Sequence, residues 1–227
     1  RFKCDWSSDV CSSDLIAAGA RANMPPIPGI KLDGVTTLLS MADTDYLRKI
    51  RDDKQVKQAV VIGGGLIGVE ACEALQTSGI QVTVVEAVDQ VLTFLDWDLA
   101  KLVENHIKAK GAKVLVGVGV KEFVGENGKL TGVKLADGTV LDCGVAIMAI
   151  GVRPNSDLAR EAGLAIGKFG GVTVNQHMQT SDPDIYAAGD CVEIPNRITG
   201  DPAFAPMGDL ANLEGREIGR ASCRERV

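Results

Sequence analysis

Short apolar segments alternate with amphipathic segments between residues 36 and 150, which is the pattern of an α/β fold. Continuous apolar runs predict parallel strands that are buried on both faces, and we expect these strands at residues 59–62, 82–85, 113–116 and 145–150. Apolar residues at helical spacing predict helices at residues 36–53, 66–77 and 96–110. The order of these elements predicts a Rossmann-like domain with a three-layer arrangement around a parallel sheet.

Residues 118–141 follow a different pattern. Three short apolar segments, at residues 118–124, 130–135 and 139–141, are separated by the polar turn sequences ENGK and ADG. Turns of this kind connect neighbouring antiparallel strands, so we expect an antiparallel β-meander here. Farther along, the sequence predicts a last strand at residues 184–188 and the start of a helix at residues 207–216.

The charge of the chain restricts its partners. There are 24 Lys and Arg residues against 30 Asp and Glu residues, which gives a formal net charge of −6. An acidic chain disfavours binding to duplex nucleic acid or to an anionic membrane. No apolar run approaches the length of about 18 residues that spans a bilayer. We therefore expect a small-molecule substrate, no nucleic acid and no membrane.

The two ends of the sequence differ from the rest. Residues 5–15 (DWSSDVCSSDL) and 218–227 (IGRASCRERV) resemble the translation of common sequencing adapters. The alternative is a polar tail at one end and a basic tail at the other. We expect residues 1–15 and 217–227 to be adapter-derived. Residues 5–15 and 218–227 are expected to make no consistent contacts with the core. Residues 16–216 are then expected to be an internal fragment of a longer protein.

The cysteines and histidines do not form the pattern of a disulfide scaffold or a metal site. Three cysteines lie away from the adapter-like ends: Cys72, Cys143 and Cys191. None of them forms a C-x-x-C pair. Reduced thiols and a cytoplasmic location are therefore expected. His106 and His177 share no metal-ligand spacing, so we expect no metal.

A glycine-rich turn joins the first predicted strand to the next helix. The turn is a G-x-G-x-x-G motif formed by Gly63, Gly64, Gly65, Leu66, Ile67 and Gly68. The first glycine permits a tight turn, the second lets backbone N–H groups approach a pyrophosphate, and the third allows close packing of helix and strand. The start of the helix adds unpaired N–H donors and the positive end of its dipole. The motif predicts dinucleotide binding, and the alternative is a glycine turn without a ligand.

An acidic residue follows the second predicted strand. Glu86 stands 18 residues beyond Gly68 (86 − 68 = 18), at the position where an acid hydrogen-bonds the adenosine ribose of a dinucleotide. The next residues are Ala87, Val88 and Asp89, so no Arg or Lys follows directly to bind a 2′-phosphate. The sequence therefore predicts NAD in preference to NADP.

Four segments resemble those of a known family, and they occur in the same order: VVIGGGLIGVEACEAL, VTVVEA, AIGVRPN and DIYAAGDCVE. The family is that of the FAD-dependent pyridine nucleotide–disulfide oxidoreductases, and the resemblance is greatest to the branch that contains NADH oxidase, NADH peroxidase and coenzyme A-disulfide reductase. The resemblance implies that an NAD(H)-binding domain at residues 35–152 is inserted into a truncated FAD-binding domain. Residues 16–34 and 153–216 are expected to be the two parts of that FAD-binding domain.

The resemblance also implies which residues hold the cofactors. FAD is expected to contact Ala18, Gly19, Gly189, Asp190 and Gly208. Ala18 replaces the usual threonine of the family, and Asp190 is expected to bind a ribityl hydroxyl. The nicotinamide is expected near Gly151. Glu70 corresponds to an acid near the contact of flavin and nicotinamide and is the candidate catalytic residue; the alternative is that it only complements the dipole of its helix.

The activity implied by the resemblance is transfer of a hydride from NADH to FAD, followed by electron transfer through a cysteine to a disulfide, a peroxide or dioxygen. The redox cysteine and the first FAD glycine motif are expected before residue 16, and the interface domain of a homodimer after residue 216. The fragment itself is therefore expected to be inactive. The alternatives are an NADH reductase of a rubredoxin- or ferredoxin-type partner, and a non-catalytic nucleotide-binding module.

Overall fold

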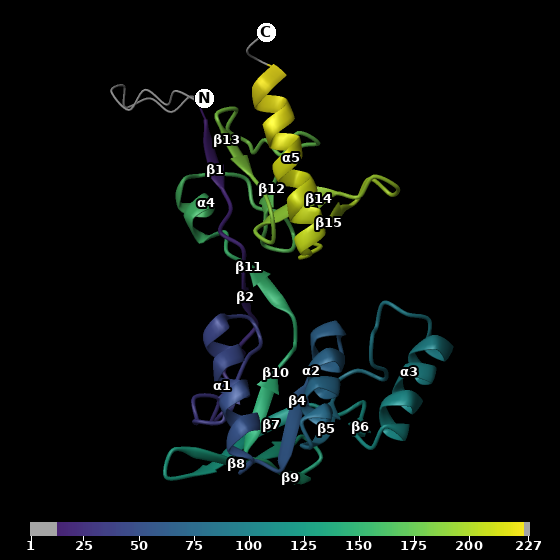
Figure 1. Ribbon diagram of the computed structural model, residues 1–227. Coiled ribbons are helices and arrows are strands. Elements are labelled where there is room, and N and C mark those ends of the chain that lie inside the picture. Colours follow the sequence, from purple (N-terminus) through teal and green to yellow (C-terminus); the bar gives the residue numbers. More distant parts are fainter. Residues whose placement is uncertain (1–12, 225–227) are drawn as a thin grey trace. The chain divides into compact units, whose positions relative to one another are not determined.

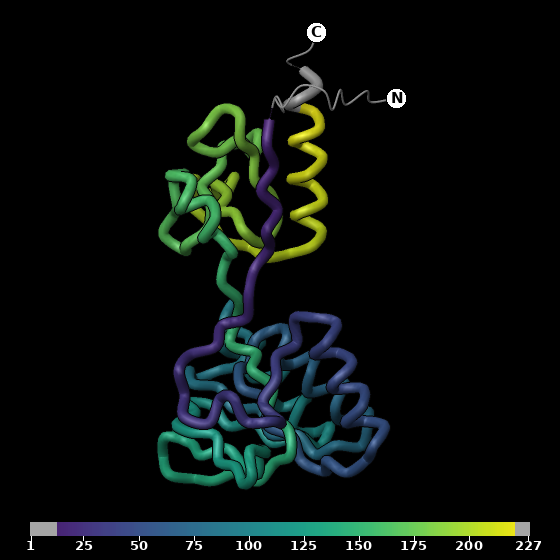
Figure 2. Tube along the Cα trace, turned by 90° about the vertical axis from the view of Figure 1, so that its left-hand side faces the viewer, coloured from purple at the N-terminus to yellow at the C-terminus, as the bar shows by residue number. Residues whose placement is uncertain are grey.

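The computed structural model describes residues 13–224 and the side chains of residues 13–220. The chain forms two compact units. Residues 22–151 form unit 2, and the described residues before and after them form unit 1. The chain passes between the units twice (Figures 1 and 2), where β2 (Ala20–Ala22) pairs with β11 (Val152–Pro154).

A five-stranded parallel sheet forms the centre of unit 2 (Figure 1). Its strands, in spatial order, are β3 (Val35–Thr36), β10 (Val145–Met148), β4 (Gln58–Ile62), β5 (Gln81–Val85) and β6 (Lys113–Leu115). All neighbouring pairs are parallel, and Val61 of β4 lies between Ile147 of β10 and Val84 of β5. The four strands that the apolar runs predict are therefore present, and β3 is an additional edge strand.

Helix α1 (Met41–Asp53) begins later than the sequence pattern predicts. Thr36 does not open the helix but pairs with Ile147 in the sheet. The Oγ of Ser40 accepts a hydrogen bond from the N–H of Asp43 at 3.1 Å, and the Asp43 carboxylate accepts one from the N–H of Ser40 at 2.9 Å. This reciprocal capping box satisfies two backbone donors at once and fixes the start of the helix at Met41.

Helices cover one face of this sheet. Helix α2 (Leu66–Thr77) has the predicted bounds, and α3 (Trp97–Ala109) lies within its predicted segment. Together with α1 they bury the side chains of Val61, Val84 and Ile147, which are 0% exposed. Because successive residues of a strand point to opposite faces, these three side chains belong to one face of the sheet.

An antiparallel meander covers the other face. Its strands are β7 (Val120–Glu126), β8 (Lys129–Leu135) and β9 (Val140–Asp142). They pack against Val60 and Met148. These residues are adjacent in sequence to Val61 and Ile147, which face the helices. Helices, parallel sheet and meander therefore make three layers, which confirms the predicted fold class of this unit.

Residues 22–34 pack with unit 2, whereas the sequence placed them with the other domain. The side chains of Ile27, Ile30 and Leu32 lie against the buried cluster beneath the meander. Because these apolar groups are buried there, the compact units divide after residue 21 and not after residue 34.

Unit 1 is built from small sheets. Strands β1 (Asp14–Ile16) and β13 (Ile185–Ala187) form a parallel pair, and a second sheet contains β12 (Val172–Thr173), β14 (Val192–Pro195) and β15 (Pro202–Ala203). The helices are α4 (Asp157–Glu161) and α5 (Gly208–Arg224). The core consists of six residues: Ala159, Leu164, Val172, Ala187, Cys191 and Val192. Of these elements, the sequence pattern predicted only β13 and the start of α5.

Part of the N-terminal adapter-like segment lies in this unit. Asp14 and Leu15 pair with β13, although the side chain of Leu15 is 56% exposed. Backbone hydrogen bonding next to an existing strand needs no particular side chain, which explains why these residues form a strand. The backbone pairing of these two residues with β13 was not expected, but neither of them belongs to the core cluster of this unit, and the prediction concerned contacts with the core. Residues 5–12 lie outside the described part of the chain.

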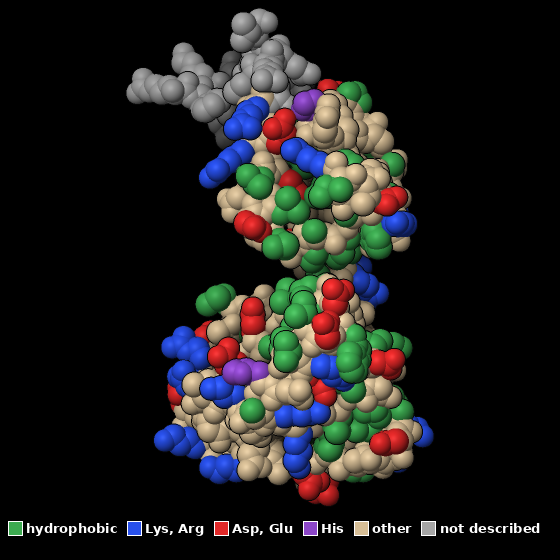
Figure 3. All heavy atoms as spheres, turned by 90° about the vertical axis from the view of Figure 1, so that its right-hand side faces the viewer, with side chains coloured by type: hydrophobic (Ala, Val, Ile, Leu, Met, Phe, Trp, Pro, Cys, Tyr) green, Lys and Arg blue, Asp and Glu red, His purple; other side chains and the backbone are tan. Residues whose placement is uncertain are grey.

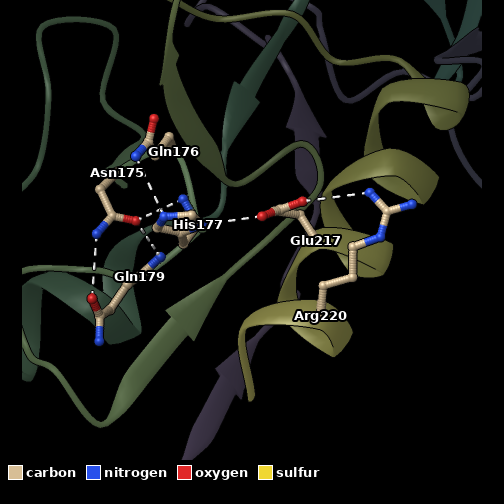
Figure 4. Close-up of polar contacts among 6 residues, drawn as sticks. All are labelled: Asn175, Gln176, His177, Gln179, Glu217 and Arg220. Atoms are coloured by element: carbon tan, nitrogen blue, oxygen red, sulfur yellow. Dashed lines mark hydrogen bonds and ion pairs between the residues drawn. The ribbon is translucent and has the colours of Figure 1, made fainter. Parts of the chain in front are cut away.

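The C-terminal half of α5 contacts a loop of unit 1 (Figure 4). Glu217 Oε1 lies 3.1 Å from His177 Nδ1, and Glu217 Oε2 lies 3.8 Å from Arg220 Nη1. Asn175 Oδ1 accepts hydrogen bonds from the N–H groups of His177 and Gln179, which holds the loop in place. Glu217 thus joins α5 to this loop, although we expected it to lie outside the fold.

The face of each unit that Figure 3 shows carries both charge signs. Acidic and basic side chains are interspersed on the face that Figure 3 shows. Among residues 13–224, no helix has both the length and the apolar character needed to cross a membrane.

Candidate functional site

The glycine turn follows β4 and can be made only by glycine at two of its positions. Gly63 has a φ of +108° and donates its N–H to Val85 O at 2.8 Å. A Cβ added at Gly63 would overlap the carbonyl oxygen of Ala149, and a Cβ at Gly68 would overlap that of Gly63. The first and last glycines of the motif are therefore required by a left-handed backbone and by close packing.

The middle of the turn leaves open space at the start of α2. Gly65 is the N-cap and no side chain caps the helix. A Cβ added at Gly65 would meet no atom within 4 Å. The first helical hydrogen bond recorded at this end runs from Val69 N–H to Gly65 O, so the first-turn N–H groups of Leu66 and Ile67 have no partner within the helix. An open, glycine-lined cradle with unpaired donors fits the pyrophosphate of a dinucleotide.

Glu86 lies directly against this turn. Its Oε2 accepts the N–H of Gly64 at 2.6 Å, and its Oε1 accepts the N–H of Val88 at 3.0 Å. The carboxylate is half-buried and keeps further lone pairs for a ligand. The structure therefore brings together the acid and the glycine motif that the sequence placed 18 residues apart.

A lysine that the sequence reasoning missed lies near the loop after Glu86. Lys101 Nζ is 3.4 Å from the carbonyl oxygen of Asp89 and 2.6 Å from Glu104 Oε2. Glu104 also pairs with Lys108 at 2.7 Å. Burial alone would raise the pKa of Glu104, but the two ammonium groups hold it below its usual value. Lys101 does not stand among the residues that directly follow Glu86. It lies in α3, 12 residues beyond Asp89 (101 − 89 = 12), and only the packing of α3 brings it to this loop.

The two remaining candidates of unit 2 lie at exposed positions. Glu70 is exposed in α2, and its carboxylate makes no hydrogen bond or ion pair with any residue in the described part of the chain. Gly151 follows β10 with a φ of +86°, and a Cβ there would meet nothing within 4 Å. The structure leaves both positions accessible to a ligand.

The residues proposed for FAD all lie in unit 1. Ala18 and Gly19 follow β1, and Gly189 and Asp190 follow β13. Because β1 and β13 are parallel neighbours, these two turns leave the same edge of the sheet, which is where α/β sheets bind ligands. The carboxylate of Asp190 accepts no hydrogen bond from the described residues, so it is available to a ligand hydroxyl.

Asn155 holds the first of these turns, and sequence reasoning gave it no role. Its Nδ2 donates to Ala18 O at 3.0 Å, and its backbone N–H donates to Gly19 O at 2.9 Å. Its Oδ1 accepts from Arg21 Nη1 at 2.9 Å, and Arg21 also pairs with Asp157 at 3.0 Å. The two contacts with Ala18 and Gly19 span more than 130 residues of chain, so only the folded unit reveals them.

Glu214 holds the second turn from α5. Its Oε2 accepts the N–H of Gly189 at 2.6 Å, and the residue is 5% exposed. Burial raises the pKa of this carboxyl, and the nearby charge of Asp190 acts in the same direction, while the hydrogen bond from Gly189 opposes the shift. Gly208, at the first residue of α5, leaves open space where a Cβ would stand.

The cysteines of the described core are not suited to redox chemistry. Cys72, Cys143 and Cys191 are free and buried. Burial raises the pKa of Cys72 to about 11 and that of Cys143 to about 12, with smaller contributions from Glu73 and Asp142. Thiols with such pKa values stay protonated near neutral pH, which indicates structural roles.

A parallel α/β sheet with a glycine turn and an acid at its carboxyl edge defines the class of dinucleotide-binding proteins. The profile of the family described as "Pyridine nucleotide-disulphide oxidoreductase" matches residues 9–207. The chain belongs to this family, which implies that FAD and a nicotinamide dinucleotide are its cofactors.

Several relatives are similar over most of this chain. It is 41% identical over 207 residues to an NADH oxidase of Methanocaldococcus jannaschii, covering 91% of this chain and 46% of the relative. An NAD-dependent persulfide reductase from A. fulgidus has a TM-score of 0.88 at 42% identity, covering 92% of this chain and 38% of that one. An FAD-dependent pyridine nucleotide-disulphide oxidoreductase from Desulfovibrio vulgaris has a TM-score of 0.83 at 39% identity, covering 92% of this chain and 53% of that one. The chain thus spans about half or less of the length of these proteins.

Proposed function

We propose that this chain is the nicotinamide-binding part, with a portion of the flavin-binding part, of a flavoprotein oxidoreductase. The activity proposed for the whole protein is transfer of a hydride from NADH to FAD, with the electrons passing on to a disulfide, a peroxide or dioxygen. The observation that carries the proposal is the open cradle at Gly65, which directly follows Gly64, the residue whose N–H binds the Glu86 carboxylate. Membership in the family supports it.

Different groups around the glycine turn are proposed to bind different parts of the dinucleotide. When bound, the nicotinamide supplies the hydride and the flavin accepts it. The first-turn N–H groups of α2 hold the pyrophosphate, and Gly65 leaves room for it. Glu86 accepts hydrogen bonds from the adenosine ribose with the lone pairs that Gly64 and Val88 leave unused.

A preference for NADH is part of the proposal. The negative charge of Glu86 repels a 2′-phosphate, and Ala87 and Val88 supply no compensating cation. Lys101 lies near this loop, but its charge is already paired with Glu104 at 2.6 Å. A bound 2′-phosphate would have to compete with that ion pair, which supports NADH over NADPH.

The flavin is proposed to lie against the two turns of unit 1. Ala18 and Gly19 would approach it through their backbone, Asp190 would accept a hydrogen bond from a ribityl hydroxyl, and Gly208 would face it at the start of α5. Open space at Gly19 and Gly208 and the unused carboxylate of Asp190 support this placement. Gly151 and Glu70 are proposed to lie near the nicotinamide.

The proposal is tested by titrating the full 227-residue chain with NADH and NADPH. We expect NADH to bind at least about tenfold more tightly than NADPH. Gly65→Val fills the open cradle, so it should weaken NADH binding by about tenfold or more without unfolding the chain.

Gly215→Val is the matched control, because a Cβ at Gly215 also meets nothing within 4 Å and the residue lies in α5 of unit 1. It should leave NADH affinity unchanged. Equal NADH affinity of Gly65→Val and the unaltered chain would refute the proposed site, and equal affinities for the two nucleotides would refute the preference.

A further inference from the structure

The loop that follows β5 holds the backbone of Gly64 through both its N–H and its carbonyl oxygen. Its N–H donates to Glu86 Oε2 at 2.6 Å, and its carbonyl oxygen accepts the N–H of Leu92 at 2.8 Å. Gly64 is buried and stands between the tight turn at Gly63 and the N-cap at Gly65. The two peptide groups that flank Gly64 are therefore both held, and their orientation determines how the chain enters α2.

The loop that holds Gly64 is itself well fixed. Glu86 Oε1 accepts the N–H of Val88 at 3.0 Å, so both carboxylate oxygens are in use. Leu92 is 7% exposed and has a φ of +49°, a left-handed conformation that a leucine adopts only where its surroundings impose it. Val91 is fully buried, and its Cγ1 would lie 2.8 Å from a Cβ added at Gly64.

The buried N–H of Gly64 has no acceptor in the described structure besides Glu86. A buried backbone donor without a partner is unfavourable, so loss of the carboxylate would drive the Gly63–Gly64 peptide to rotate or to admit water. Rotation at Gly64 would move Gly65 and the first-turn N–H groups of α2, which together form the proposed phosphate cradle.

We infer that Glu86 is a positioning residue for the phosphate cradle, in addition to its proposed contact with the ribose. Its carboxylate fixes Gly64, and Gly64 fixes the donors that face the pyrophosphate. The phosphate part of this inference rests on the proposed function. The acid therefore links ribose recognition and phosphate recognition through one hydrogen bond.

The test separates the two roles with a ligand that has no ribose hydroxyls. The full chain, Glu86→Ala and Glu86→Gln are titrated with ADP and with 2′,3′-dideoxy-ADP. Both variants remove the negative charge, but only glutamine keeps an oxygen that can accept the N–H of Gly64. We expect Glu86→Gln to bind dideoxy-ADP about fivefold more tightly than Glu86→Ala, the size of one net hydrogen bond.

A matched pair in the same loop provides the control. Asp89 is exposed, and its carboxylate accepts no hydrogen bond from the described residues. Asp89→Ala and Asp89→Asn should therefore bind dideoxy-ADP equally. Equal dideoxy-ADP affinities of Glu86→Ala and Glu86→Gln would overturn the inference, because a residue that acts only through the ribose predicts that equality.

A second measurement needs no nucleotide. Hydrogen exchange of the Gly64 amide in the free chain should be at least about tenfold faster in Glu86→Ala than in Glu86→Gln, because only alanine leaves this N–H unprotected. Unchanged exchange would overturn the inference. If the unaltered chain bound neither NADH nor ADP, the proposed function would fail, and the exchange rates would still decide whether Glu86 holds the turn.

Discussion

The first and last glycines of the turn in unit 2 and the two turns of unit 1 are held in different ways. In unit 2, Gly63 bonds to the neighbouring strand through its backbone and Gly68 packs directly on Gly63. In unit 1, the turn at Ala18 is held by the side chain of Asn155, and the turn at Gly189 by that of Glu214.

The difference follows from the sheets that carry the turns. The sheet of unit 2 has five strands with both faces covered, so main-chain bonds and dense packing fix the first and last glycines of the turn, and the Glu86 side chain holds only Gly64 between them. The pair β1–β13 of unit 1 has two strands, and the core beside it is small. There, single polar side chains determine the turn conformations, and each contributes only a modest free energy.

The largest expected effect comes from Gly68→Ala in unit 2. A Cβ at this position overlaps the carbonyl oxygen of Gly63, so either the helix or the strand must move. We expect the free energy of unfolding to fall by about 3 kcal/mol and NADH binding to be lost. Chemical denaturation and titration measure the two effects. Gly65→Ala, in open space, should change stability by less than about 1 kcal/mol, and similar losses for both variants would contradict the role of close packing.

A smaller effect is expected from Asn155→Ala in unit 1. The variant removes the donor to Ala18 O and the acceptor for Arg21 Nη1, both at partly exposed sites. We expect a loss of about 1 kcal/mol, because partly exposed hydrogen bonds are replaced by water. Hydrogen exchange should become faster at Asn155 and around Gly19, whereas the amides of β4 should not change. A loss as large as that of Gly68→Ala would show that unit 1 depends on this residue far more than its contacts indicate.

The smallest effect, and one of opposite sign, is expected from Glu214→Gln. Burial raises the pKa of this carboxyl in the folded state, so its stabilising contribution is present below the unfolded pKa and is lost as the pH rises through the folded pKa. Glutamine removes the buried charge but keeps an acceptor for Gly189 N–H. At pH 7 the variant should be more stable than the unaltered chain by up to about 1 kcal/mol, and the gap should close as the pH falls to about 4. Thermal unfolding of both proteins between pH 4 and pH 7 measures this difference in stability. A difference that does not vary with pH would contradict the raised pKa of Glu214 as its cause.

Local sequence patterns predicted unit 2 well and unit 1 poorly. The helix at residues 66–77, the buried strands and the meander are each specified by their own apolar periodicity, and the structure has them at or near the predicted bounds. Strands such as β12 and β15 have two residues each, too few to show a period. The start of α1 was predicted too early because Thr36 lies in a strand that only its partner β10 defines.

The sequence by itself determined the α/β class, the glycine motif and the identity of the acid at Glu86, because these depend on residues close together in the chain. Only the tertiary structure decided that Glu86 bonds to Gly64, that Lys101 reaches the loop after β5, and that Asn155 and Glu214 hold the turns of unit 1. Contacts of this kind join side chains to backbone groups that lie 12 or more residues apart. Local sequence patterns do not predict such contacts, because only the packing of the elements brings these groups within hydrogen-bonding distance.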